Sequence, residues 1–114
     1  MVDVDPERFR QLVADALDDL PPDLGEVMQN VAVVVNDTSP PGSVLGLYEG
    51  IPLTERAEYG GLALPDRITI FRRAICRMCA GEEEVVAQVR ITVVHEVAHH
   101  FGISDARLEE LGWG

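Results

Sequence analysis

The sequence predicts a single α+β domain over residues 1–114. A small mixed sheet of three or four strands packs on a long central helix, with further helices at the N- and C-terminal ends. Three observations predict this fold. Short β-branched runs are separated by turn-forming residues, which is typical of strands. Residues 82–101 repeat valine at helical spacing without a break. A length of 114 residues with 46% hydrophobic side chains suits one domain with its own core.

The first expected element is an amphipathic helix over residues 6–19. Asp5 is a favoured N-cap residue, and Pro6 suits the first helical position. Pro21 and Pro22 end the helix because proline cannot continue it. Apolar residues then follow helical spacing: Phe9, Leu12, Val13, Ala16 and Leu17.

Three segments have the character of strands. Residues 31–35 form an apolar, β-branched run that predicts a strand buried on both faces. Residues 44–48 predict a second, weaker strand because Gly46 interrupts it. Residues 67–71 alternate in polarity and predict a third. Residues 49–65 are rich in glycine and proline and predict a long loop between the last two strands.

The C-terminal third of the chain is predicted to be helical. A short helix is expected over residues 72–79, and the longest helix over residues 82–101, with buried valines holding it in the core. Gly102 ends this helix because glycine tolerates a positive φ. Ser104 or Asp105 caps a last helix that runs to about residue 111, and Trp113 is expected to pack back on the core.

The net charge, the apolar runs and the cysteines of the chain each bear on its class of function. The formal net charge is −11 and all nine basic residues are arginine, so the surface repels phosphate backbones and nucleic-acid binding is not expected. No apolar run could span a membrane and no signal peptide is recognised, so we expect a cytoplasmic protein. Cys76 and Cys79 could form a redox pair or lend two metal ligands, but two reduced, packed thiols are the favoured interpretation.

All three histidines of the chain lie within residues 95–100, on the long helix. His95 and His99 are four residues apart, so they share one helical face and can hold one divalent metal, with zinc the favoured ion. Glu96 lies about 100° around the helix, where its carboxylate can activate a water on the metal for hydrolysis. Three further side chains share roughly the histidine face, opposite the valines: Gln88, Ile91 and Thr92.

A zinc site needs a third protein ligand, and Asp105 is the candidate. It comes three residues after Gly102, where the chain can reverse and present a carboxylate to the metal. Two alternatives remain open: Asp105 caps the last helix, or Glu109 or Glu110 supplies the ligand instead. His100 points away from His99 and is expected to lie outside the ligand set.

The segment from His95 to Asp105 resembles the zincin metallopeptidases, because it matches the pattern H-E-x-x-H-x-x-G-x-x-H/D with Asp105 in the last position. It is most similar to small bacterial zincin-like proteins described as minimal metallopeptidases. The resemblance implies a zincin-like fold and one zinc ion held by His95, His99 and Asp105. It implies Glu96 as general base, and a peptide or protein substrate lying in extended form along an edge strand.

The sequence also departs from the larger members of this group. They place a methionine turn after the third ligand, whereas Met28 and Met78 lie upstream here. Tyr48 and Tyr59 are candidates for stabilising an oxyanion by their chemistry alone. A zinc-dependent peptidase is therefore the leading hypothesis, and a metal-binding interaction module without peptidase activity is the alternative. A small metallo-nuclease is less favoured, since Glu96 and the acidic charge both oppose it.

Overall fold

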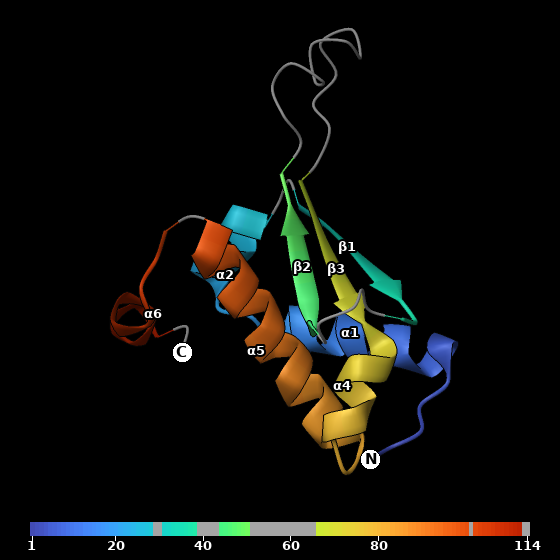
Figure 1. Cartoon of the computed structure of the whole chain (residues 1–114). Helices are drawn as coiled ribbons and strands as arrows, with labels where there is room; N and C mark the ends of the chain where they lie inside the picture. Colours follow the sequence, from blue (N-terminus) through green and yellow to red (C-terminus); the bar gives the residue numbers. More distant parts are fainter. Residues whose placement is uncertain (29–30, 39–43, 51–65, 101, 113–114) are drawn as a thin grey trace, which may run out of the picture.

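The computed structural model describes residues 1–28, 31–38, 44–50, 66–100 and 102–112. Within them the elements follow in the order α1 (Pro6–Asp18), α2 (Pro22–Val27), β1 (Val31–Asn36), β2 (Gly46–Glu49), β3 (Asp66–Phe71), α4 (Arg72–Met78), α5 (Glu82–His100) and α6 (Asp105–Leu111) (Figure 1). The predicted α+β fold is confirmed. Most of the predicted 49–65 loop lies outside the described residues, as does Trp113; Glu49 belongs to β2 rather than to the loop.

The central strand of the three-stranded sheet is β3. It pairs in parallel with β1 and antiparallel with β2, so the predicted mixed sheet is confirmed. Ile68 and Ile70 of β3 are fully buried. The expectation that β1 is buried on both faces is wrong, because β1 lies at an edge: Val34 is 38% exposed and its neighbouring valines are only partly buried.

The central helix of the domain is α5, as predicted. It packs against α1 on one side and against β2 and β3 on another (Figure 1). Val89, Val93 and Val97 are fully buried, as the valine pattern predicts. Val86 is only partly buried, and Val85 takes its place in the core. This burial stabilises a helix whose β-branched residues have modest intrinsic helix propensity.

The first helix begins as predicted. The Asp5 carboxylate accepts a hydrogen bond from the Arg8 N–H at 2.9 Å, and Pro6 occupies the first turn. The helix ends at Asp18, close to the predicted boundary. The six-residue helix α2 was not predicted. It begins at Pro22, because proline suits the first position of a helix although it cannot continue the helix before it.

The two cysteines are free and buried, as predicted. Cys76 lies within α4, and Cys79 follows its last residue. Burial raises the pKa of both thiols, which keeps them protonated and unreactive near neutral pH. Among the helices in the described part of the chain, none has the length and apolar character needed to cross a membrane.

Candidate metal centre

The last two turns of α5 carry three of the four predicted site residues. His95 and His99 are exposed, one helical turn apart, and Glu96 between them is partly buried. The buried valines of the same helix face the core, so the polar residues face outward towards β2. The helix therefore has one apolar side that packs in the core and one polar side that is more exposed, as its sequence predicts.

Gly46 lets the edge strand β2 approach this helix closely. A Cβ atom at Gly46 would lie 2.7 Å from Thr92 Cγ2 and 3.2 Å from the Thr69 carbonyl oxygen, so a larger residue would not fit without movement. Thr92 is buried beneath the strand, and its hydroxyl donates a hydrogen bond to the Gln88 carbonyl at 2.8 Å. The glycine that weakened the predicted strand is thus the residue that brings the strand onto the helix.

Two neighbouring pockets form a groove between α5 and β2, which we call the α5–β2 groove. The first has a volume of about 250 Å³ and contains His95; the second has about 350 Å³ and contains His99. Glu96 lines both. The first pocket is completed by the side chains predicted to share the histidine face and by the start of the strand: Gln88, Ile91, Thr92, Val44, Leu45 and Gly46. The second is completed by Leu47, Tyr48 and His100.

His100 closes one end of the groove. Its ring stacks on the ring of Tyr48, and a Cβ atom at Gly50 would lie only 3.2 Å from His100 Cε1. The Tyr48 hydroxyl in turn donates a hydrogen bond to Asp66 Oδ2 at 3.0 Å. Sequence reasoning placed His100 outside the ligand set but missed this contact, because no sequence pattern pairs the end of α5 with the end of β2.

The two tyrosines proposed for oxyanion stabilisation have different outcomes. Tyr48 lines the pocket that holds Glu96 and His99, but its hydroxyl is engaged with Asp66. Tyr59 lies outside the described residues. An oxyanion donor is therefore not assigned among the side chains that the structure describes.

The chain reverses after α5 as predicted. Gly102 has a φ of +69°, and the N–H groups of Gly102 and Ile103 donate to the carbonyls of His99 and Ala98, which is the Schellman arrangement. Ser104 occupies the N-cap position of α6, where its hydroxyl accepts from the Arg107 N–H at 3.2 Å. Asp105 is the first residue of α6 and not its cap.

The third ligand is not seen among the described side chains. The Asp105 side chain lies outside what the structure describes. Among the side chains that it does describe, no three of the His, Cys, Asp and Glu residues gather closely enough to hold a metal ion. Neither Glu109 nor Glu110 therefore joins His95 and His99, and Glu110 instead forms an ion pair with Arg107 at 2.9 Å.

The chain matches a known protein family. The sequence profile of a family described as "Zincin-like metallopeptidase" matches residues 28–113. This range includes the whole sheet, α5 and α6, and therefore every residue considered for the site. A search of curated proteins finds no match.

Proposed function

The chain belongs to the zincin-like metallopeptidases, and we propose that it is a zinc-dependent peptidase with its catalytic centre in the α5–β2 groove. One observation carries this proposal. Glu96 lies where the two pockets of the groove meet, with His95 in one pocket and His99 in the other. A carboxylate between two potential metal ligands is placed to accept a proton from a water held between them.

The proposed donors are of the types that zinc prefers. His95 and His99 supply two imidazoles one helical turn apart, and Asp105 is the proposed third ligand, after the reversal at Gly102. Three such ligands leave a fourth position open, as catalytic zinc sites require. When bound, zinc supplies a Lewis acid and lowers the pKa of a coordinated water towards neutrality.

Glu96 is the proposed general base. Its carboxylate accepts the proton of the attacking water, and the resulting acid can deliver that proton to the departing amine. The partial burial of Glu96 under β2 restricts its side chain, which helps to hold the carboxylate towards the groove. General acid–base catalysis of this kind contributes roughly 10²–10⁴-fold to a rate.

The proposed substrate is an extended peptide that binds along β2. No described strand pairs with the outer edge of β2, so its backbone groups can form hydrogen bonds with a peptide. Half of the exposed large hydrophobic side chains in the described part of the chain line this groove: Val44 at 41%, Leu47 at 41% and Ile91 at 47% exposed. This lining favours substrates with aliphatic side chains on either side of the cleaved bond.

The test is turnover by the zinc-loaded chain on a mixed peptide library, with products identified by mass spectrometry. Glu96→Gln is expected to lower kcat by roughly 10²–10⁴-fold while the zinc content stays the same. Glu83→Gln, at an exposed carboxylate in the first turn of the same helix, is the control and should leave kcat unchanged. Unaltered turnover by Glu96→Gln would remove Glu96 as the general base.

A second candidate is a metal-binding interaction module that holds peptides without cleaving them. The observation that favours it is the engagement of the Tyr48 hydroxyl by Asp66, which leaves the groove without an assigned oxyanion donor among the described residues. If the zinc-loaded wild type binds library peptides but releases no products, this candidate replaces the peptidase.

A further inference from the structure

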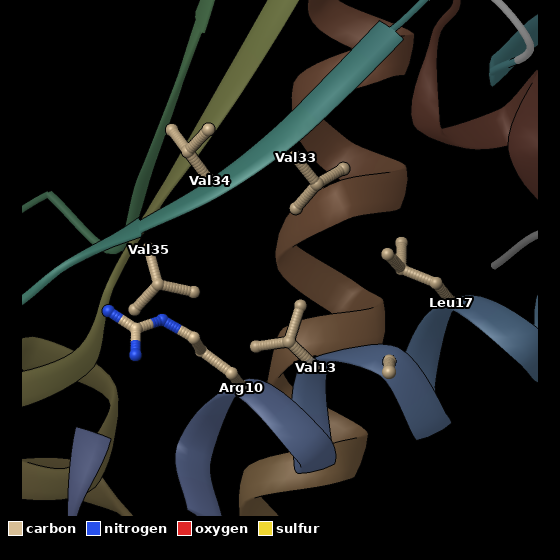
Figure 2. A pocket seen from close by; sticks show the side chains of 7 residues that line it. Arg10, Val13, Leu17, Val33, Val34 and Val35 are labelled. Atoms are coloured by element: carbon tan, nitrogen blue, oxygen red, sulfur yellow. The ribbon is translucent and has the colours of Figure 1, made fainter. Parts of the chain in front are cut away.

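A second groove lies at the other edge of the sheet, between α1 and β1 (Figure 2). We call it the α1–β1 groove. It has a volume of about 440 Å³, larger than either pocket of the α5–β2 groove. Because β3 separates β1 from β2, this groove is distinct from the proposed catalytic centre. Six side chains matter to the argument: Arg10, Val13 and Ala14 of α1, and Val33, Val34 and Val35 of β1.

The walls of this groove are apolar. Val13 is buried at its base, and Val33 and Val35 are partly buried on the same side of β1, facing α1 (Figure 2). Val34 is 38% exposed, and Ala14 is exposed on the helix. Alternate side chains of an added strand could therefore contact the valines and the helix together.

The outer edge of β1 is not paired with any of the strands that the structure describes. Its other edge pairs with β3 along all six residues. Edge strands are normally protected by charges, proline or a bulge. Residues 31–36 of β1 contain neither a charged residue nor proline, and the ladder with β3 is regular. The strand thus has an edge suited to strand addition.

The end of the groove is positively charged. Arg10 extends beside Val35 and makes no hydrogen bond or ion pair with a described residue (Figure 2). Asp37, directly after β1, is paired with Arg72 at 2.8 Å. Arg73 also lies beside Asp37, because its backbone N–H donates to the Asp37 carbonyl at 3.1 Å. The hydrogen bond from Arg72 lowers the pKa of Asp37, and the charges of Arg73 and Arg10 lower it further. Arg10 and Arg73 are then positive charges left without an ion pair among the described residues, in a chain of net charge −11.

We propose that the α1–β1 groove binds an extended segment of a partner protein, which adds to β1 as a strand, sets alternate apolar side chains against the groove valines, and places a carboxylate at Arg10. Charge complementarity favours such a partner over a second copy of this chain. The six residues of β1 contain no carboxylate, so pairing two β1 strands would leave Arg10 unmatched. It would also bring together two chains that each carry −11. The proposal does not depend on the peptidase activity.

The test uses the full chain and a fluorescein-labelled peptide of alternating valine and threonine that ends in two glutamates. Binding is measured by fluorescence anisotropy, and amide hydrogen exchange of residues 33–35 reports strand addition. We expect saturable binding, with a Kd below roughly 1 mM, and slower exchange at β1. Versions with the glutamates at the other end, or replaced by lysines, establish the direction and the charge requirement.

Two variants make the test specific. Arg10→Glu should lower the affinity for the glutamate peptide by about tenfold or more and should raise the affinity for the lysine peptide. Ala14→Trp should fill the groove and lower the affinity for both peptides. Ala87→Trp, at an exposed alanine of α5, should leave both affinities unchanged.

Several outcomes would overturn the proposal. The first is that no peptide shows saturable binding. The second is that Ala87→Trp lowers peptide affinity as much as Ala14→Trp does. The third is that Arg10→Glu binds the glutamate peptide as tightly as the wild type. A concentration-dependent dimer of the wild type that Ala14→Trp abolishes would assign the groove to a second copy instead. If Ala14→Trp does not fold, the affinities of Arg10→Glu for the glutamate and lysine peptides test the proposal without it.

Discussion

The imidazole ring of His100 stacks on the phenol ring of Tyr48, with ring centroids 4.0 Å apart and an interplanar angle of 20°. Tyr48 lies on β2 and His100 is the last residue of α5, so this contact joins the end of the edge strand to the end of the helix that carries Glu96. The hydrogen bond from Tyr48 to Asp66 extends the contact to β3. One end of the α5–β2 groove is therefore held by a stack between two elements distant in sequence.

Replacing His100 should loosen this end of the groove. His100→Ala removes the stack and is expected to lower the free energy of unfolding by about 1 kcal/mol, the usual contribution of an aromatic pair. His100→Phe keeps a ring over Tyr48 and should retain most of that stability. Urea denaturation measures both, and the zinc content should be unchanged because His100 is outside the proposed ligand set. Equal losses in the two variants would show that the stack itself does not stabilise the contact.

Gly46 should be intolerant of a side chain. Gly46→Ala places a Cβ atom against Thr92 Cγ2 and the Thr69 carbonyl, and is expected to destabilise the fold by about 1–3 kcal/mol, as overpacking does. Thr92→Ser removes Cγ2 while keeping the hydroxyl that donates to Gln88, so the double variant should recover part of the loss. Gly25→Ala on α2, where a Cβ atom meets nothing within 4 Å, is the control and should be neutral or slightly stabilising. A Gly46→Ala variant as stable as wild type would mean that β2 shifts freely on α5.

Local signals predicted much of the fold and of the site. The Asp5 cap and the positive φ at Gly102 depend on interactions within a few residues, and the buried face of α5 follows from the helical spacing of its valines; the sequence predicts each of them. The same holds for the shared face of His95 with Gln88, Ile91 and Thr92, which follows from helical periodicity and reappears as one pocket.

The features that were missed depend on which elements become neighbours. The apolar run of β1 predicts a doubly buried strand, but strand order is set by the whole sheet, and β3 takes the central place. The close approach at Gly46 and the stack of Tyr48 on His100 likewise require β2 to lie over α5. Helix α2 is different, because its start is visible in the sequence: Pro22 suits the first position of a helix, although the pair Pro21-Pro22 also predicts the end of α1.

The ion pair between Asp37 and Arg72 should make stability depend on pH in the acid range. The hydrogen bond from Arg72 lowers the pKa of Asp37 in the folded state below its unfolded value of about 3.9. A lowered carboxylate pKa stabilises the fold above the unfolded pKa, and this contribution is lost as the pH falls through the folded pKa. Asp37→Asn should therefore be less stable than wild type at neutral pH, with the difference shrinking towards pH 3.

Urea denaturation of both proteins across this range measures the effect. Asp15→Asn is the control, since Asp15 is exposed on α1 and accepts no hydrogen bond from a described residue. Its stability difference from wild type should vary much less with pH. A constant difference between Asp37→Asn and wild type from pH 7 to pH 3 would contradict the assignment.

The start of α6 allows the helix cap and the proposed metal ligand to be separated. Ser104 caps the helix, and Asp105 is the next residue, so neighbouring substitutions should have different effects. Ser104→Ala removes the hydroxyl that accepts from Arg107 and should lower the free energy of unfolding by about 1 kcal/mol, as loss of an N-cap does. Its affinity for zinc should remain close to that of the wild type.

Asp105→Ala should show the opposite pattern. If the carboxylate is the third ligand, its removal should weaken zinc binding by more than about 100-fold, because loss of an outer-shell partner alone typically weakens binding 10–100-fold. The stability of the metal-free protein should change little, since Ser104 keeps the cap. Competition with a chromophoric chelator measures the zinc affinity, and denaturation in the presence of excess chelator measures the metal-free stability. Full zinc affinity in Asp105→Ala would exclude this residue as a ligand, whereas a loss confined to zinc binding would establish that Asp105 acts on the metal and not on the helix.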